Sequence, residues 1–80
     1  MSAGAQRVAD REWDAGELGC GELVLELRLR LDAMAPGQVL KLTALDAGAP
    51  ADLPAWCRMT GHRLLQAEPP KFVIERRAES

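Results

Sequence analysis

The chain has 80 residues, of which 48% are hydrophobic and 28% charged, and its formal net charge is −2. This length permits one small domain with a single core. The interspersed charges lack the basic stripe of a nucleic-acid-binding protein, and no apolar run approaches the roughly 20 residues of a membrane-spanning helix. The first ten residues contain no signal-peptide core, so we expect a cytoplasmic protein whose thiols stay reduced.

The domain is predicted to span residues 10–77. Residues 1–9 are small, polar and aperiodic, which is typical of a flexible N-terminus, and residues 78–80 continue the domain as a charged tail. Residues 11–14 are predicted to form the first strand, which leads the chain to Gly16 and then to Cys20.

Cys20 stands between Gly19 and Gly21 at the start of an apolar segment. A helix that starts here directs unpaired N–H groups and a partial positive charge at the residue, which favours the nucleophilic thiolate. The two glycines are expected to let the backbone bend sharply and to leave the sulfur uncrowded. The carboxylate of Glu22 lies in the same first turn, where it also interacts with the positive end of the helix and disfavours a second negative charge at Cys20. Free cysteines are commonly small buried hydrophobes, but these neighbours favour a functional thiol at Cys20.

Residues 23–34 fit two patterns. Five leucines alternate at odd positions from 23 to 31, which on periodicity alone indicates a strand. The segment also fits one face of a helix, its residues are helix formers, and Pro36-Gly37 follows as a stop signal. We therefore predict a helix. It leaves Leu25 and Leu29 off the buried stripe, where they form a candidate partner surface.

Residues 38–45 alternate as a strand, with Leu40, Leu42 and Ala44 on the buried face. A loop over residues 46–50 follows, and Asp52 is expected to cap a second helix with Pro54 in its first turn.

The buried face of that helix is predicted to carry Leu53, Trp56, Cys57 and Thr60. Gly61 ends the helix in a left-handed conformation. Cys57 is therefore expected in the core, and His62 is expected to be a capping or surface residue.

Two short strands, residues 63–67 and 71–75, complete the chain. The order β-α-β-α-β-β predicts an α/β (α+β) two-layer sandwich, in which two helices cover one face of a mixed four-stranded sheet. Trp13 is expected to serve packing. The arginine pairs 28/30 and 76/77 are expected to be solvated, and docking of an acidic partner is the alternative for them.

Over residues 11–76 the chain resembles the TusA/SirA-like family of small sulfur-carrier proteins. The resemblance rests on motif residues spread along the chain: Asp14, Gly16, Cys20, Pro36-Gly37, Asp46, Asp52-Leu53-Pro54 and Gly61-His62-Arg63-Leu64. It implies the same β-α-β-α-β-β fold. It also implies that Cys20, with Gly19, Gly21 and Glu22 supporting its loop, accepts sulfane sulfur as a persulfide and passes it between donor and acceptor proteins.

The chain departs from the family where two prolines follow the cysteine, because Gly21 and Leu23 stand in their places. Proline pre-sets the first helical turn, whereas glycine loosens it. The alternative is therefore a non-catalytic binding or regulatory module that keeps the fold but has lost sulfur transfer. A redox enzyme is a third reading, but the only other cysteine, Cys57, is expected inside.

No cofactor or metal is expected. Cys20, Cys57 and His62 are too few for a tetrahedral site, and no CxxC spacing is present. A disulfide between the two cysteines would need an oxidising compartment. A strongly activated Cys20 would need a neighbouring cation, for which the candidates are Arg58, Arg63 and His62.

Overall fold

The structure, a computed structural model, describes residues 9–78 and, at Cys20, the backbone. Six elements follow one another along the chain: β1 (Arg11–Gly16), α1 (Cys20–Asp32), β2 (Val39–Ala44), α2 (Ala49–Thr60), β3 (Arg63–Glu68) and β4 (Lys71–Glu75). Residues 1–8 of the predicted flexible N-terminus and residues 79–80 of the predicted tail lie outside the described residues, so those two predictions are not tested.

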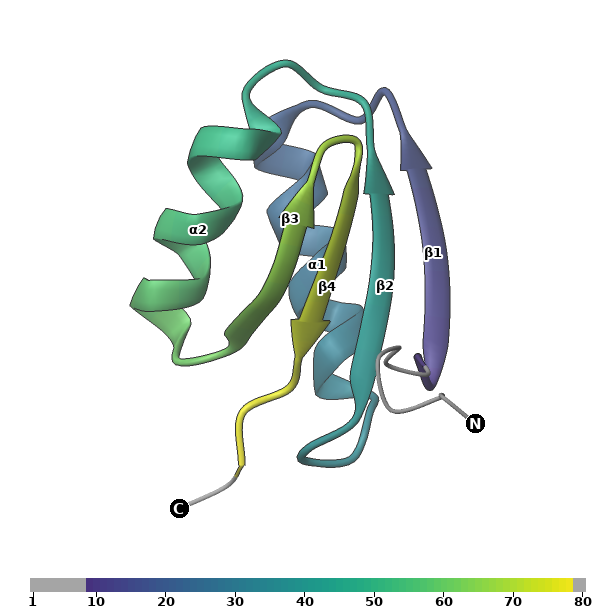
Figure 1. Ribbon diagram of the computed structural model, residues 1–80, viewed down its shortest axis with the longest axis vertical. Helices are drawn as coiled ribbons and strands as arrows, with labels where there is room; N and C mark the ends of the chain where they lie inside the picture. Colours follow the sequence, from purple (N-terminus) through teal and green to yellow (C-terminus); the bar gives the residue numbers. More distant parts are fainter. Residues whose placement is uncertain (1–8, 79–80) are drawn as a thin grey trace.

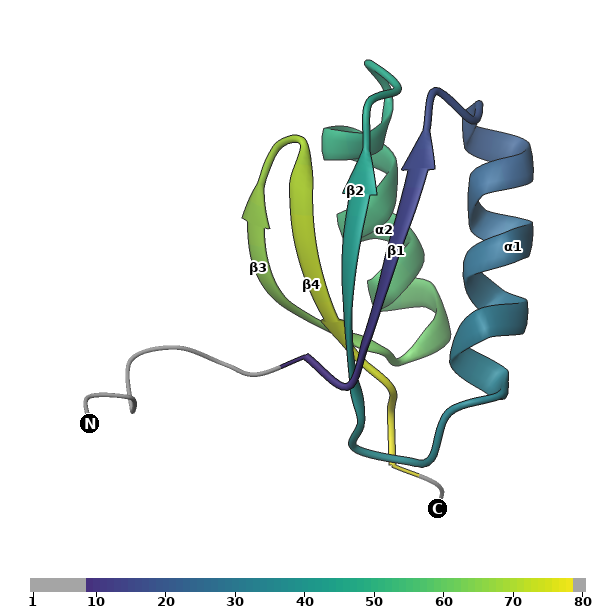
Figure 2. The same cartoon turned by 90° about the vertical axis from the view of Figure 1, so that its right-hand side faces the viewer.

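The four strands form one mixed sheet in the order β1-β2-β4-β3 (Figure 1). β1 runs parallel to β2, and β4 runs antiparallel to both β2 and β3. A parallel pair cannot be joined by a tight turn, and α1 provides the crossover between β1 and β2. Both helices lie on the same face of the sheet (Figure 2). The predicted two-layer sandwich is confirmed.

The leucine-rich segment forms α1, as predicted. Leu23, Leu27 and Leu31 recur every four residues and are fully buried against the sheet. Leu25 and Leu29 lie outside this stripe and are 59% and 57% exposed. The leucines alternate along the sequence because the helix carries them on two faces. Only the face with Leu23, Leu27 and Leu31 contributes to the core.

The core between the two layers is built from the predicted faces. The strands contribute their alternate side chains and the helices their buried stripes: Leu40, Leu42, Ala44, Phe72 and Ile74 from β2 and β4, and Leu23, Leu27, Leu31, Leu53, Trp56 and Cys57 from α1 and α2. Thr60 is only partly buried. Gly61 ends α2 with φ 88°, as predicted.

The predicted start of α2 is wrong. The helix begins at Ala49 with Gly48 as N-cap, so Asp52 lies within the first turn instead of capping it. The turn is made by Asp46, whose carboxylate accepts the Gly48 N–H at 2.9 Å and whose carbonyl accepts the Ala49 N–H at 3.0 Å. Pro50 fits in the first turn because no helical hydrogen bond requires an N–H there.

The C-terminal arginines are not simply solvated. Arg76 Nε donates to the Leu31 carbonyl at 2.8 Å, and an Arg77 guanidinium N–H donates to the Thr60 carbonyl at 3.1 Å. Each arginine thus satisfies a carbonyl in the last turn of one helix, where a positive charge is also favoured. The residues that follow β4 tie the ends of α1 and α2 together.

The expectation of a capping or surface position for His62 is also wrong. The imidazole is buried and stacks on Trp56, with ring centroids 5.4 Å apart, and its Nδ1 accepts the Arg77 N–H at 3.0 Å. Burial, followed by the charges of Arg77 and Arg76, lowers the His62 pKa. This histidine is a neutral packing residue.

Candidate functional site

α1 begins at Cys20, as the sequence predicts, with Gly19 as N-cap in an extended conformation (φ −70°, ψ 163°). The Gly19 carbonyl accepts the first helical hydrogen bond, from the Leu23 N–H at 2.7 Å. Gly19 has no side chain with which to cap the amides of the first turn. These N–H groups and the positive end of the helix dipole therefore surround the backbone of Cys20.

The sharp turn expected at the glycines beside Cys20 lies instead at Gly16. Gly16 has φ 59°, and its N–H donates to the Asp14 carboxylate at 2.9 Å. Its carbonyl accepts the Leu45 N–H at 2.9 Å, which fixes the loop before Cys20 to the end of β2. Gly19 and Gly21 have ordinary φ, and a Cβ added at either would meet nothing within 4 Å.

Cys57 lies in the core, as predicted. It is 3% exposed on the inner face of α2, and burial raises the pKa of its thiol to about 11. At neutral pH this thiol is protonated and shielded from reagents, so it is unsuited to act as a nucleophile.

None of the three candidate cations accompanies Cys20. Arg58 lies in the last turn of α2, His62 lies between α2 and β3, and Arg63 starts β3, at the opposite end of the sandwich from the start of α1 (Figures 1 and 2). Arg63 pairs with Glu75 at 3.4 Å. The first turn of α1 carries an acidic residue instead, Glu22.

Sequence reasoning missed a groove between α1 and β1. It encloses about 270 Å³ and is lined by three apolar and three charged side chains: Trp13, Leu18, Leu25, Glu22, Glu26 and Arg30. The Arg30 guanidinium lies 4.3 Å from the Trp13 ring centroid and pairs with Glu26 at 3.8 Å, so Arg30 is not merely solvated. The only sequence signal was the helical spacing of Glu22, Leu25, Glu26 and Leu29, which places these residues on one side of α1.

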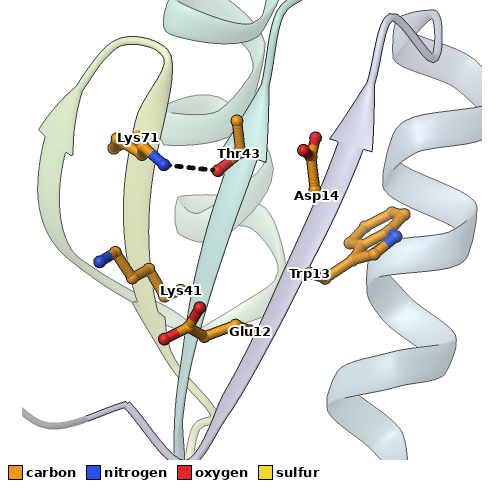
Figure 3. Close-up of a pocket in the computed structure, with 6 residues that line it drawn as sticks. All are labelled: Glu12, Trp13, Asp14, Lys41, Thr43 and Lys71. Carbon is orange, nitrogen blue, oxygen red and sulfur yellow. Dashed lines mark hydrogen bonds between the residues drawn. The ribbon is translucent and has the colours of Figure 1, made fainter.

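The open face of the sheet carries a second depression, of about 360 Å³, lined by Glu12, Trp13, Asp14, Lys41, Thr43 and Lys71 (Figure 3). Lys71 Nζ donates to Thr43 Oγ1 at 3.2 Å, and Glu12 pairs with Lys41 in the strand register. Opposite charges on neighbouring strands offset one another here. We interpret this face as a solvated sheet surface.

Among the described residues, no three His, Cys, Asp or Glu side chains group closely enough to hold a metal ion. Within the same part of the chain, no helix has the length and apolar character needed to cross a membrane.

A two-layer α/β domain whose first helix opens on a cysteine has the architecture expected of a small sulfur carrier. Comparison with known proteins bears this out: the family described as Sulfurtransferase TusA matches residues 11–76. The chain belongs to the TusA family.

Curated relatives agree with this assignment. The chain is 37% identical over 59 residues to the sulfur carrier protein TusA of Allochromatium vinosum, covering 74% of this chain and 78% of that protein. It is 44% identical over 54 residues to a putative sulfur carrier protein of Neisseria meningitidis serogroup A, covering 68% of this chain and 73% of that protein. The sulfur carrier protein TusA of Pseudomonas putida strain GB-1 is 37% identical over 59 residues, 74% of each chain.

Proposed function

We propose that Cys20 carries sulfane sulfur as a persulfide and relays it between a donor protein and an acceptor protein in the cytoplasm. The observation that supports this most is the position of Cys20 as the first residue of α1 in a chain of the TusA family. The other cysteine, Cys57, is buried and has a raised pKa, which leaves Cys20 as the candidate nucleophile.

The transfer consists of two thiol exchange steps that balance without an external oxidant. The Cys20 thiolate attacks the terminal sulfur of a donor persulfide, the donor S–S bond breaks, and the donor leaves as a thiolate. A thiolate of the acceptor then attacks the terminal sulfur of the Cys20 persulfide, and Cys20 leaves as a thiolate. The uncapped amides at the start of α1 stabilise this anion, an effect of about 0.3–1 kcal/mol for a helix terminus at an exposed site.

Gly19, Gly21 and Glu22 have supporting roles in this proposal. The two glycines place no Cβ beside Cys20, so the backbone amides stay open to an approaching sulfur. The carboxylate of Glu22 opposes the helix dipole and moderates the stabilisation of the thiolate.

Mass spectrometry of the intact protein tests the proposal. After incubation with a polysulfide and removal of excess reagent, we expect a gain of about 32 Da per sulfur bound. The gain should disappear in Cys20→Ser and persist in Cys57→Ser. Loading of neither cysteine, or of Cys57 alone, would exclude the proposed carrier function.

A second candidate, a binding module without sulfur transfer, is favoured by the exposure of Leu25 and Leu29 on α1. It predicts that Cys20→Ser keeps full function in cells whereas Leu25→Glu abolishes it. Loss of function in Cys20→Ser supports the carrier.

A further inference from the structure

The groove between α1 and β1, called the α1 groove below, lies beside the start of the helix that Cys20 opens. Leu18 precedes Cys20 by two residues, and Glu22 follows it by two. Trp13 and Arg30 also line the groove, and the Arg30 guanidinium stacks on the Trp13 ring at 4.3 Å from its centroid. The groove therefore runs from the cysteine loop toward the Trp13–Arg30 pair.

The apolar surface continues beyond the groove along α1. Leu25 lines the groove and is 59% exposed, and Leu29, one turn further on, is 57% exposed. Both side chains are more than half exposed, and neither contributes to the core cluster. Adjacent exposed leucines beside a groove are typical of a surface that another protein covers.

The charge around the groove has one sign at the cysteine end. Glu17 precedes Cys20 by three residues, Glu22 follows it by two and Glu26 by six, and Glu22 and Glu26 line the groove. Glu26 pairs with Arg30 at 3.8 Å, whereas Glu22 is the lining carboxylate nearest to Cys20 in the chain. A complementary surface must therefore bring positive charge.

A second copy of the chain is a poorer occupant. The arginines that it could bring from its own α1 are already engaged: Arg30 with Trp13 and Glu26, and Arg28 with Asp32 at 3.9 Å. Stable dimers also bury about 800 Å² on each partner, whereas transient contacts are smaller. A brief contact with a different, basic protein fits a short groove flanked by two leucines.

We propose that the α1 groove is the docking surface for a basic segment of the proteins that exchange sulfur with Cys20. An apolar side chain of that segment packs on Trp13, Leu18 and Leu25, and a lysine or arginine next to it pairs with Glu22. The inference rests on the proposed carrier function. It adds the chemistry of the partner, which is apolar and cationic.

The test uses two synthetic peptides of alternating leucine and lysine, or leucine and glutamate, each ending in a cysteine activated as a mixed disulfide with thionitrobenzoate. The Cys57→Ser chain is used so that only Cys20 reacts, and release of thionitrobenzoate gives the rate constant. We expect the basic peptide to react at least about tenfold faster at low ionic strength. The advantage should shrink several-fold near ~0.5 M salt, where screening is strong.

Substitutions in the groove separate docking from the net charge of the protein. Leu25→Ser and Glu22→Gln should each lower the ratio of the basic-peptide rate to the acidic-peptide rate by about threefold or more, because this ratio cancels any change in the intrinsic reactivity of Cys20. The matched controls are Met59→Ser, at a residue that is 80% exposed on α2, and Glu68→Gln on the far edge strand β3. Both controls should react as the parent does. Equal rates for the two peptides, or equal losses in groove and control variants, would overturn the proposal.

Two further measurements keep the outcomes distinct. Sedimentation of the wild-type chain reports self-association, and a dimer dissolved by Leu25→Ser would assign the groove to a second copy and overturn the docking proposal. Polysulfide loading reports the carrier function alone. A chain that prefers the basic peptide but takes up no sulfur refutes the carrier function, and a chain that loads sulfur without that preference refutes the docking surface.

Discussion

The two ends of the sandwich use charge in opposite ways. At the end where both helices finish, Arg76 and Arg77 donate to the Leu31 and Thr60 carbonyls, and the Arg77 N–H donates to His62. At the end where α1 starts, no side chain caps the helix, and residues 12–27 contain carboxylates but no cation. At the first end the charged side chains join segments that are far apart in the chain, whereas at the second end the carboxylates of Asp14 and Asp46 accept N–H groups only two residues away.

This difference indicates how a small domain divides its residues between stability and chemistry. Arg58 and Arg63 were the arginines expected from the sequence to activate the thiol. They belong instead to the end where the helices finish and where long-range hydrogen bonds stabilise the fold. The end that carries Cys20 is held by backbone contacts, such as the Leu45 N–H to the Gly16 carbonyl at 2.9 Å. We expect substitutions to cost stability at the first end and to be tolerated at the second.

The largest loss of stability is expected for Arg76→Ala. The variant removes the half-buried guanidinium that bonds the Leu31 carbonyl at the end of α1. Hydrogen bonds to charged groups contribute about 1.5–3 kcal/mol, so urea denaturation should show a loss in that range. Arg28→Ala, which removes an exposed arginine from the same helix, should change stability by no more than about 0.5 kcal/mol. Equal losses in the two variants would show that the hydrogen bond from Arg76 to the Leu31 carbonyl does not stabilise the end of α1.

A pH dependence is expected from His62, the only histidine in the chain. Its pKa is lowered in the folded protein, so as the pH falls below about 6.5 the unfolded state binds a proton before the folded state does. The stabilising contribution is complete above that pH and is lost as the pH falls toward the folded pKa. The urea midpoint of the wild-type chain should therefore be lower at about pH 5.5 than at about pH 7.5.

His62→Gln is the control for this pH dependence. Glutamine keeps a hydrogen-bond acceptor for the Arg77 N–H but has no charge to gain. The difference between the two midpoints should therefore be smaller in the variant than in the wild type. An unchanged difference would show that other groups are responsible, and a direct NMR titration of the His62 ring provides the same test without any substitution.

The fold could be predicted because its signals are local. The helix-forming residues of α1, the alternation of Leu40, Leu42 and Ala44, and the stop at Gly61 each reflect a preference that acts within a few residues. The start of α2 was missed because Asp46 competes with Asp52 as a turn-forming acid, and the sequence does not rank the two.

The roles of the charged residues were hidden for a different reason. Arg76 meets Leu31 across 45 positions of the chain, and His62 is buried because the segment after β4 covers it. The Trp13–Arg30 contact likewise joins a strand to a helix. Such pairs form only when the fold brings distant segments together, and periodicity carries no information about them. The position of Cys20 at a helix start was local, and it was predicted correctly.

The smallest change in stability is expected for Gly21→Ala. This variant tests directly whether the start of α1 has room for an added side chain. Gly21 lies in the first turn of α1, and a Cβ there meets nothing within 4 Å, so alanine should stabilise the fold by about 0.5–1 kcal/mol. Gly61→Ala is the matched variant at the other end. Its φ of 88° and a Cβ that would lie 3.3 Å from Arg77 Cδ predict a loss of about 1–2 kcal/mol. Thermal denaturation of both variants measures the two changes. If Gly21→Ala destabilises the protein as Gly61→Ala does, the start of α1 is as tightly constrained as the end of α2, and the contrast between the two ends fails.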